Sequence, residues 1–401
     1  MSYKFLLFTL ILSPMVYGKQ MSIPVVTIVP VANLATEPSS KRFPNDPNPY
    51  DKLGTTYKSG IDSCPRLHQL LFNEQVRIIE QNGNDVLIEV PYLYFQTSPK
   101  GHKINRYWTD KRYFRPLKAI PQSQSCIPKP IDFNQLTTDH NNITTLTKPF
   151  YHCPSNTTYS AGTRFITTKH TSRGDSVLIY DPTTKQTHKA SIPAGFCIHP
   201  TEIPAQKQKE EFFVKLLKKW VHDSNGQIPY VWGGCSFNHP YASLNYSVQD
   251  HMYKDKLHSN YTLTGHYPAC DSGFDCTGLI LRAAQIAQLP YFFKNTTTVG
   301  FRVKPLKRNE PIASGDLILF PGHIIVISDV NKNLVIEARS KYDDYGYIHE
   351  VPLNKVFRGI NTFDDLRQAY MSNLKLERLN AHDKTISQIP IRILKLNSIW
   401  R

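Results

Sequence analysis

The apolar positions of residues 206–222 recur three and four residues apart, a spacing that predicts an amphipathic helix. Its polar face is basic, and we interpret it as a helix that packs between domains rather than on a membrane. Residues 277–288 predict a second helix. Three short apolar runs then predict neighbouring strands, over residues 316–320, 323–328 and 333–338. Helices followed by antiparallel strands favour an α+β domain over residues 204–401.

The first half of the chain instead alternates apolar and polar residues in short runs, as strands do. Residues 75–80 and 85–90 flank Asn82-Gly83-Asn84, a glycine-centred turn that predicts a β-hairpin. We therefore expect two small all-β domains ahead of the α+β domain. Their expected ranges are 19–128 and 146–203, with a polar linker rich in proline and asparagine over 129–145.

The chain opens with a short apolar stretch, Phe5 to Leu12, that follows Lys4. The small residues Val16 and Gly18 come shortly after it, and together these features are typical of a secretory signal peptide over residues 1–18. The stretch is too short to cross a bilayer, which takes about 20 apolar residues. We expect an exported protein without stable membrane insertion.

Composition narrows the class of partner. With 40% hydrophobic and 20% charged residues, the chain of 401 residues has the composition of a globular protein and not of a disordered one. Lys and Arg number 47 against 32 Asp and Glu, which gives a net charge of +15 and favours anionic partners. The basic residues are dispersed and form no recognition motif, so we expect no nucleic-acid binding.

Seven cysteines are present, and an odd number in an exported protein leaves one thiol unpaired. If Cys276 is that thiol, the other six fall into sequential pairs that disulfides could join. The pairs would be Cys64 with Cys126, Cys153 with Cys197, and Cys235 with Cys270. Buried free thiols are the alternative.

Three residues have the types that nucleophilic catalysis requires. Cys276 follows a glycine-bearing loop and opens an apolar helix, where the helix dipole and free N–H groups lower the pKa of a thiol. His323 begins a strand just after Pro321-Gly322 and could act as the base. Glu337 is a carboxylate inside an apolar strand and could orient that histidine. Taken one by one, they could be a core cysteine, a structural histidine and a solvent-facing glutamate.

Four motifs in this order resemble the NlpC/P60 cysteine peptidases over about residues 205–360. The motifs are Pro229-Tyr-Val-Trp-Gly-Gly234, Phe274-Asp-Cys-Thr-Gly278, Ser314-Gly-Asp-Leu317 with Gly322-His323, and Val335-Ile-Glu-Ala338. The resemblance implies a papain-like fold in which Cys276 is the nucleophile and His323 the base. Glu337 occupies the position of the third polar residue of the site, which in this family is usually a histidine. His349 is therefore a second candidate for orienting His323.

The resemblance also implies residues that bind substrate. Tyr230, Asp275 and Thr277 match family positions that line the substrate cleft, with Thr277 in place of the usual serine. The front of the chain resembles the bacterial SH3 (SH3b) modules of γ-D-glutamyl-L-diamino acid endopeptidases, so both all-β domains are expected to be SH3-like barrels. A glutamate matching Glu74 helps such enzymes to hold the free amino end of the stem peptide; an ordinary strand carboxylate is the alternative.

The expected function is hydrolysis of peptidoglycan stem peptides or muropeptides in the periplasm or cell envelope of a bacterium, or outside the cell. The resemblance implies cleavage between γ-D-Glu and the diamino acid, meso-diaminopimelate or lysine. A non-catalytic wall-binding protein with a decayed peptidase domain is the alternative, and an amidase or acyltransferase on the same fold is a third option. Residues 235–270 form an insertion whose histidines match no standard metal site, so we expect neither metal nor cofactor.

Overall fold

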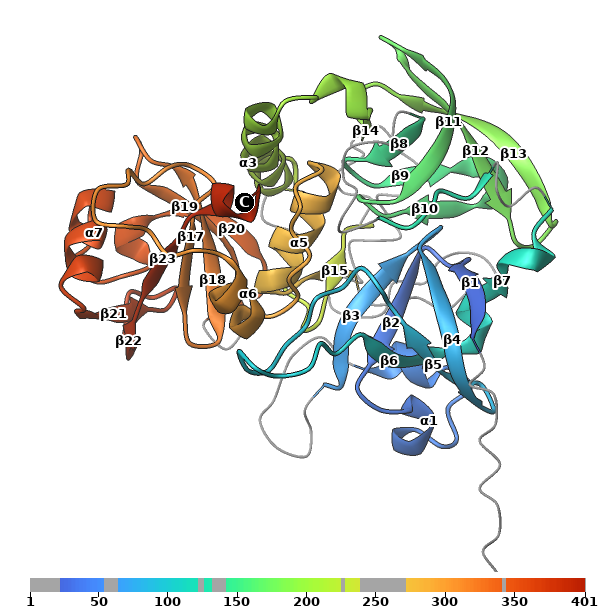
Figure 1. Cartoon of the computed structure of the whole chain (residues 1–401), viewed down its shortest axis with the longest axis horizontal. Coiled ribbons are helices and arrows are strands. Elements are labelled where there is room, and N and C mark those ends of the chain that lie inside the picture. Colours follow the sequence, from blue (N-terminus) through green and yellow to red (C-terminus); the bar gives the residue numbers. More distant parts are fainter. Residues whose placement is uncertain are drawn as a thin grey trace, which may run out of the picture.

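The computed structural model describes residues 22–53, 64–121, 126–131, 142–224, 228–238, 272–340 and 344–400. It is a mixed α/β protein in which the paired strands of every sheet are antiparallel. Figure 1 shows two β-rich parts on one side, a sheet flanked by helices on the other, and the helix that begins with Cys276 between them. The expected signal peptide, Cys270 and most of the insertion lie outside the described residues.

The N-terminal part is a seven-stranded sheet with strand order β3-β2-β6-β5-β4-β1-β7 and a short helix α1 (Ser39–Arg42). Its strands are β1 (Ile23–Thr27), β2 (Val31–Ala35), β3 (Arg66–Leu71), β4 (Gln75–Asn82), β5 (Asp85–Glu89), β6 (Arg106–Asp110) and β7 (Phe114–Pro116). The predicted hairpin is confirmed, since β4 pairs with β5 and Asn82 faces Asp85. Gly83 turns the chain there at φ 62°, a conformation that favours glycine.

The second part is a five-stranded sheet with strand order β13-β12-β11-β8-β14, beside a two-stranded ribbon of β9 and β10. The strands are β8 (Ile143–Leu146), β9 (Phe150–His152), β10 (Thr157–Tyr159), β11 (Arg164–Thr171), β12 (Gly174–Asp181), β13 (Gln186–Pro193) and β14 (Cys197–Ile198). Strand β8 begins inside the range expected for the linker. The domain limits and the SH3-like nature of both β-rich parts stay predictions.

The C-terminal part holds a five-stranded sheet with strand order β20-β19-β18-β17-β23. Its strands are β17 (Leu317–Phe320), β18 (His323–Asp329), β19 (Leu334–Ala338), β20 (Ile348–Pro352) and β23 (Arg392–Leu394). The helices are α3 (Gln206–Asp223), α5 (Cys276–Ile286), α6 (Thr296–Arg302) and α7 (Phe363–Met371). Two short ribbons complete it, β15 (Cys235–Ser236) with β16 (Gly273–Phe274), and β21 (Lys375–Leu379) with β22 (Thr385–Pro390).

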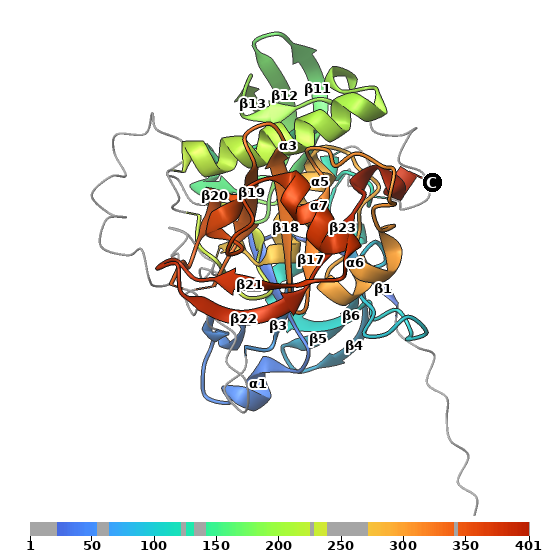
Figure 2. The ribbon, with the colours of Figure 1, turned by 90° about the vertical axis from the view of Figure 1, so that its left-hand side faces the viewer.

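Alternation along the strands gives this sheet two apolar faces. Ile324 and Val326 belong to the core that includes the apolar residues of α3 and α5, whereas Ile325 and Ile327 pack with α7. Figure 2 shows α3 running across the top of the sheet, with α7 in front of the strands. The sheet therefore lies between two layers of helix, and the start of β18 reaches the helix that carries Cys276.

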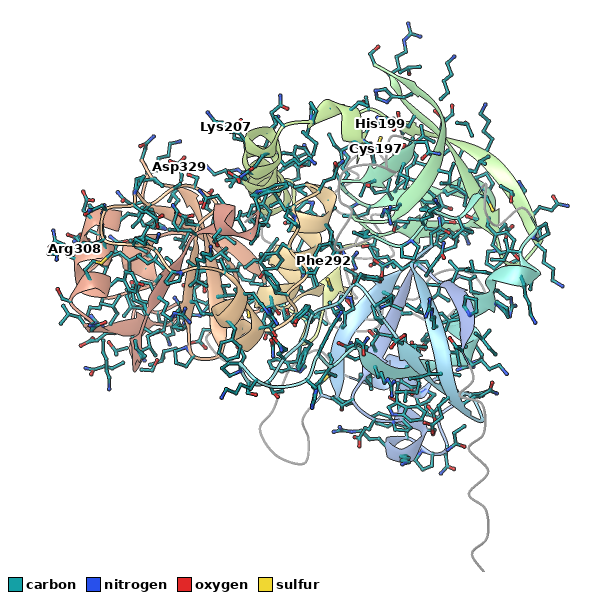
Figure 3. All side chains as sticks on the ribbon, viewed as in Figure 1. Cys197, His199, Lys207, Phe292, Arg308 and Asp329 are labelled. Carbon is teal, nitrogen blue, oxygen red and sulfur yellow. The ribbon has the colours of Figure 1, made fainter. Side chains whose placement is uncertain are left out.

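The chain after α5 joins this part to the N-terminal sheet. The backbone N–H of Tyr94 donates to the carbonyl of Phe292 over 2.8 Å, and Tyr94 forms a parallel bridge with Phe293. Figure 3 labels Phe292 at this junction. The connection between β5 and β6 of the N-terminal part thus contacts the segment that follows the Cys276 helix.

Two global findings bear on the expectations from sequence. Within the described ranges, no helix combines the length and the apolarity needed to span a bilayer. The expected disulfides are wrong, because Cys126, Cys153, Cys197 and Cys235 are free thiols and each expected pair contains at least one of them. Cys126 and Cys235 lie in hydrophobic cores and Cys197 packs against one, whereas Cys153 is exposed.

Candidate active site

Cys276 is the first residue of α5, and Asp275 caps that helix. The Asp275 carboxylate accepts a hydrogen bond from the N–H of Gly278, as a helix-capping side chain does. The ammonium of Lys294 lies 2.7 Å from the other carboxylate oxygen and is itself buried. Thr277 is within hydrogen-bond distance of both Asp275 Oδ1 and the Lys294 carbonyl, at 2.9 Å each. Asp275 and Thr277 are therefore engaged in fixing the helix start.

The glycines of the sequence motifs allow α5 to approach the 229–234 segment closely. A Cβ atom at Gly278 would lie 1.9 Å from the carbonyl oxygen of Gly234. That same oxygen accepts a hydrogen bond from the N–H of Asp275 over 3.2 Å. Two motifs that are distant in sequence thus meet beside Cys276, and the close backbone approach explains why glycine stands at these positions.

Gly278→Ala is expected to lower the melting temperature by several degrees, because its new methyl group would collide with backbone rather than with a flexible side chain; overpacking costs about 1–3 kcal/mol. Gly300→Ala on α6 is the matched control, since a Cβ there meets only the ends of Leu319 and Arg392. Differential scanning fluorimetry compares the two variants. Equal melting temperatures would show that the close approach at Gly278 does not constrain the helix.

The Cys276 thiol is more buried than the sequence indicates. The residue is 8% exposed, and burial together with the nearby Asp275 carboxylate raises the pKa of the thiol to about 12. Lys294 and the backbone N–H groups of Ile324 and Thr277 act in the opposite direction but do not compensate. The expectation of a thiol made acidic by the helix start is therefore wrong, because desolvation outweighs the helix terminus here.

His323 and Glu337 lie together as expected. The His323 Nε2 atom is 2.8 Å from Glu337 Oε2, and the carboxylate comes from the neighbouring strand β19. The Cys276 sulfur is close to the backbone N–H of Ile324, the residue after His323. Since Nε2 contacts Glu337, Nδ1 is the ring nitrogen that does not face this carboxylate. Burial lowers the pKa of His323, and Glu337 opposes that effect only in part.

Glu337 is surrounded by donors. His349 Nε2 lies 3.1 Å from Oε1, so His349, the second candidate for orienting His323, contacts Glu337 directly. Arg378 Nη2 lies 2.5 Å from Oε2, and Arg339 Nη1 lies 3.8 Å from Oε1. Burial alone would raise the pKa of Glu337, but Arg378, His323 and His349 hold it well below its usual range. Glu337 is thus an ionised carboxylate at the centre of a buried network.

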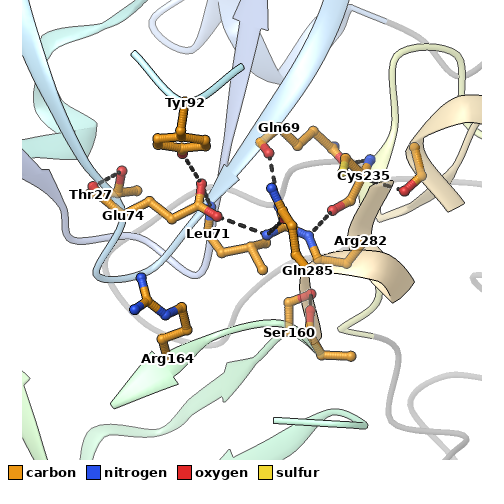
Figure 4. Close-up of polar contacts among 12 residues, drawn as sticks. Thr27, Gln69, Leu71, Glu74, Tyr92, Ser160, Arg164, Cys235, Arg282 and Gln285 are labelled. Carbon is orange, nitrogen blue, oxygen red and sulfur yellow. Dashed lines mark hydrogen bonds and ion pairs between the residues drawn. The ribbon is translucent and has the colours of Figure 1, made fainter. Parts of the chain in front are cut away.

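Glu74 belongs to the turn between β3 and β4 and contacts α5 away from Cys276. Its Oε1 atom is 2.8 Å from Arg282 Nη1, and its Oε2 accepts hydrogen bonds from the Tyr92 hydroxyl and the Leu71 N–H. Figure 4 shows these contacts, with Arg282 reaching from α5 to Glu74 and also to the carbonyls of Gln69 and Cys235. The expected contact between Glu74 and a substrate amine stays a prediction, and in this structure the carboxylate serves the packing of the N-terminal sheet on α5.

Tyr230 stands beside the helix start. It forms a parallel bridge with Phe274, two residues before Cys276, and its N–H donates to the Gly346 carbonyl over 2.8 Å. A largely apolar cavity of about 300 Å³ adjoins the turn before His323, and its lining includes Gly322, Phe320, Phe301 and Arg392. Across the described part of the chain, no three His, Cys, Asp or Glu side chains are arranged to hold a metal ion.

Three basic residues of this region were not found from sequence: Lys294, Arg282 and Arg378. Each is paired with a carboxylate that lies far away in the sequence or on another element. Arg282 gave the clearest signal, since it stands in an apolar helix where a charge is rare unless it is paired. Lys294 and Arg378 have both apolar and polar neighbours in the sequence, a local pattern that does not predict an ion pair without the fold.

Comparison with known proteins gives similarity at the level of structure only. No family model and no curated protein matches the chain. One similar solved structure is an NlpC/P60 family protein from Bacillus cereus, with 17% identity and a TM-score of 0.49, covering 82% of this chain and 94% of that one. Two further matches are NlpC2 and NlpC1 from Trichomonas vaginalis, each with 12% identity and a TM-score of 0.29, covering 84% and 87% of this chain and 95% and 94% of theirs. Because all three TM-scores lie below 0.5, this similarity alone establishes neither the activity nor the substrate.

Proposed function

We propose that the chain is an exported cysteine endopeptidase of the NlpC/P60 type that hydrolyses peptidoglycan stem peptides at the γ-D-glutamyl–diamino acid amide. The observation that carries the proposal is the meeting of Cys276, at the first turn of α5, with the start of β18, where His323 is held by Glu337. The order of the four motifs supports the family, and the apolar stretch at residues 5–12 supports export. The choice of bond follows only from the resemblance to γ-D-glutamyl-L-diamino acid endopeptidases.

In the proposed reaction the resting thiol and imidazole are both neutral, in keeping with the raised pKa of Cys276 and the lowered pKa of His323. As the sulfur attacks the amide carbonyl, His323 takes its proton at Nδ1. The imidazolium donates that proton to the departing amine, the C–N bond breaks and a thioester remains. A water molecule, deprotonated by the same imidazole, then hydrolyses the thioester and regenerates the thiol.

The helix start supplies the stabilisation that a tetrahedral oxyanion requires. Backbone N–H groups at the first turn of α5, including that of Cys276, are the donors we assign to this task. Asp275 would oppose a negative charge here, and the Lys294 ammonium, 2.7 Å from that carboxylate, offsets part of this opposition. The pair therefore lets a carboxylate cap the helix with less repulsion of the oxyanion than an unpaired Asp275 would exert.

Substrate binding is proposed for Tyr230, Asp275, Thr277 and Glu74. Tyr230 is the best placed of these, because its backbone pairs with the segment that leads into Cys276. The net charge of +15 supports attraction of stem peptides, whose free carboxylates are negative. We propose that Asp275 and Thr277 also contact the bound peptide from the start of α5. We propose that Glu74 contacts it from the N-terminal part of the chain.

Mass spectrometry of purified muropeptides after incubation with the protein tests the proposed reaction. We expect each stem peptide to gain one water and to separate between γ-D-Glu and diaminopimelate or lysine. The matched control is a synthetic peptide with an α-linked glutamate in the same sequence, which should stay intact. Cleavage at any other bond would contradict the proposed specificity, and an unchanged mixture would contradict the proposed activity.

A wall-binding protein without catalytic activity is the second candidate, and one observation favours it. The Cys276 thiol is buried and its pKa is raised to about 12, which describes an unreactive cysteine as well as a resting one. Cosedimentation with insoluble peptidoglycan distinguishes the two. Stoichiometric retention on the polymer without release of peptides would support the binding protein.

A further inference from the structure

The C-terminal ribbon contributes a cation to the His323–Glu337 pair. Arg378 projects from β21 and places Nη2 2.5 Å from Glu337 Oε2, the same oxygen that contacts His323. Arg378 is 3% exposed and Glu337 is 1% exposed, so water does not screen the interaction. The rings of Phe320 and Phe357 lie 5.2 and 5.8 Å from the Arg378 guanidinium. Arg378 is thus a fixed charge one carboxylate away from the proposed base.

We propose that Arg378 is a positioning residue that fixes the Glu337 carboxylate against His323 and keeps the His323 imidazole unprotonated until the thiol proton arrives. This inference rests on the proposed function, because it gives His323 the role of base. The residue lies 102 positions after Cys276 in the numbering, outside the four motifs that suggested the site.

The orientation argument follows from the geometry of the carboxylate. Glu337 Oε2 contacts Arg378 and His323, while Oε1 contacts His349 and lies near Arg339. With donors on both oxygens, the carboxylate cannot rotate without losing contacts that a buried charge requires. Fixing Glu337 fixes the tautomer and plane of His323, with Nε2–H toward the carboxylate and Nδ1 available to the thiol.

The charge argument concerns the proton balance of His323. Glu337 alone would favour the imidazolium, which would remove the base from use at neutral pH. Arg378 and Arg339 oppose it with positive charge, and burial acts in the same direction. Among the described residues, the other titratable groups around this network are His349 on β20 and the rings of Tyr345 and Tyr347 that contact it, together with Cys276, whose sulfur is close to the N–H of Ile324.

The backbone of β21 is held independently of the Arg378 side chain. The N–H of Leu379 donates to the Val356 carbonyl and the N–H of Arg358 donates to the Glu377 carbonyl, each over 3.0 Å. Substitution of the side chain therefore leaves the strand anchored. This separation makes the role of the guanidinium accessible to mutagenesis.

The test is an NMR titration of the His323 ring in the full-length protein labelled with ¹⁵N-histidine, the signal being assigned with a His323→Gln variant. Arg378→Gln removes the charge and keeps a donor, and we expect the pKa of His323 to rise by about one unit. Arg378→Lys keeps the charge, so we expect a pKa near that of the wild type. We expect kcat on the stem peptide to fall, because lysine loses the planar guanidinium that contacts Glu337 through Nη2 while Nη1 donates to the Val356 carbonyl. Glu377→Gln, the exposed neighbour that pairs with Arg358, is the control and should change neither.

The outcomes separate this inference from the proposed function. An unchanged pKa of His323 in folded Arg378→Gln protein would overturn the inference, whether or not the protein cleaves muropeptides. If Arg378→Gln does not fold, Arg378→Lys decides: a rise of the pKa by a full unit with the charge retained would also overturn it. A wild-type protein that leaves muropeptides intact, combined with the expected pKa shifts, would contradict the peptidase function while keeping the electrostatic role of Arg378.

Discussion

The Cys276→Ala variant is expected to hydrolyse the γ-D-glutamyl–diaminopimelyl peptide at least about 10⁴ times more slowly than the wild type. Without the sulfur no thioester can form, and His323 is left without the proton that it would pass to the leaving amine. The fold should persist, because alanine suits the first turn of a helix and removes only the sulfur from a site that is 8% exposed. Turnover by mass spectrometry and melting by circular dichroism provide the two measurements.

The pH dependence of the wild type and the His323→Gln variant complete this test. Since the pKa of His323 is lowered, its imidazole stays unprotonated to a lower pH than usual, and the acid limb of kcat/KM should lie below the ordinary histidine value of about 6.5. His323→Gln should lose activity about as severely as Cys276→Ala and should lose that limb. Activity within tenfold of the wild type in either variant would refute the assignment of nucleophile and base.

Much of the C-terminal part was predictable because its signals are local. The 3.6-residue period of the apolar positions before residue 223 predicts the helix that the structure has as α3. The apolar runs after residue 316 predict the strands β17, β18 and β19. The positions of Cys276 and His323 at element starts follow from the same pattern. These positions are sufficient to suggest Cys276 and His323 as a pair, but they do not predict which residues surround the pair.

The environment of the site depends on contacts between distant parts of the chain. Sequence indicated a helix terminus that acidifies Cys276, but the burial of that sulfur by several elements dominates its pKa. Sequence also placed Glu337 beside His323 without indicating that Arg378, 41 residues further along, fixes the carboxylate. The expected disulfides failed for a related reason, since the pairing of cysteines depends on distances that spacing alone does not give.

The placement of Glu74 shows how the N-terminal sheet bears on the proposed site. Arg282 is a buried residue of the same helix that begins with Cys276, and Glu74 reaches it from the turn between β3 and β4. A Cβ at Gly162, from the second β-rich part, would collide with the Arg282 side chain at 2.4 Å. Three parts of the chain therefore meet around one guanidinium, and the position of α5 depends on all of them.

Glu74→Gln is consequently expected to destabilise the folded protein by about 3 kcal/mol, because removing one partner of a buried ion pair leaves the other charge uncompensated. Combining it with Arg282→Met should recover most of that loss, since the double variant contains no unpaired charge. Midpoints of urea unfolding compare the three variants, with Asp383→Asn in the exposed Lys355–Asp383 pair as a control that should shift little. If Glu74→Gln unfolds at the same urea concentration as the wild type, the Glu74–Arg282 pair does not hold α5 against the N-terminal sheet. In that case the Glu74 carboxylate could be released to a substrate amine at little cost, which is the role that the sequence suggested for it.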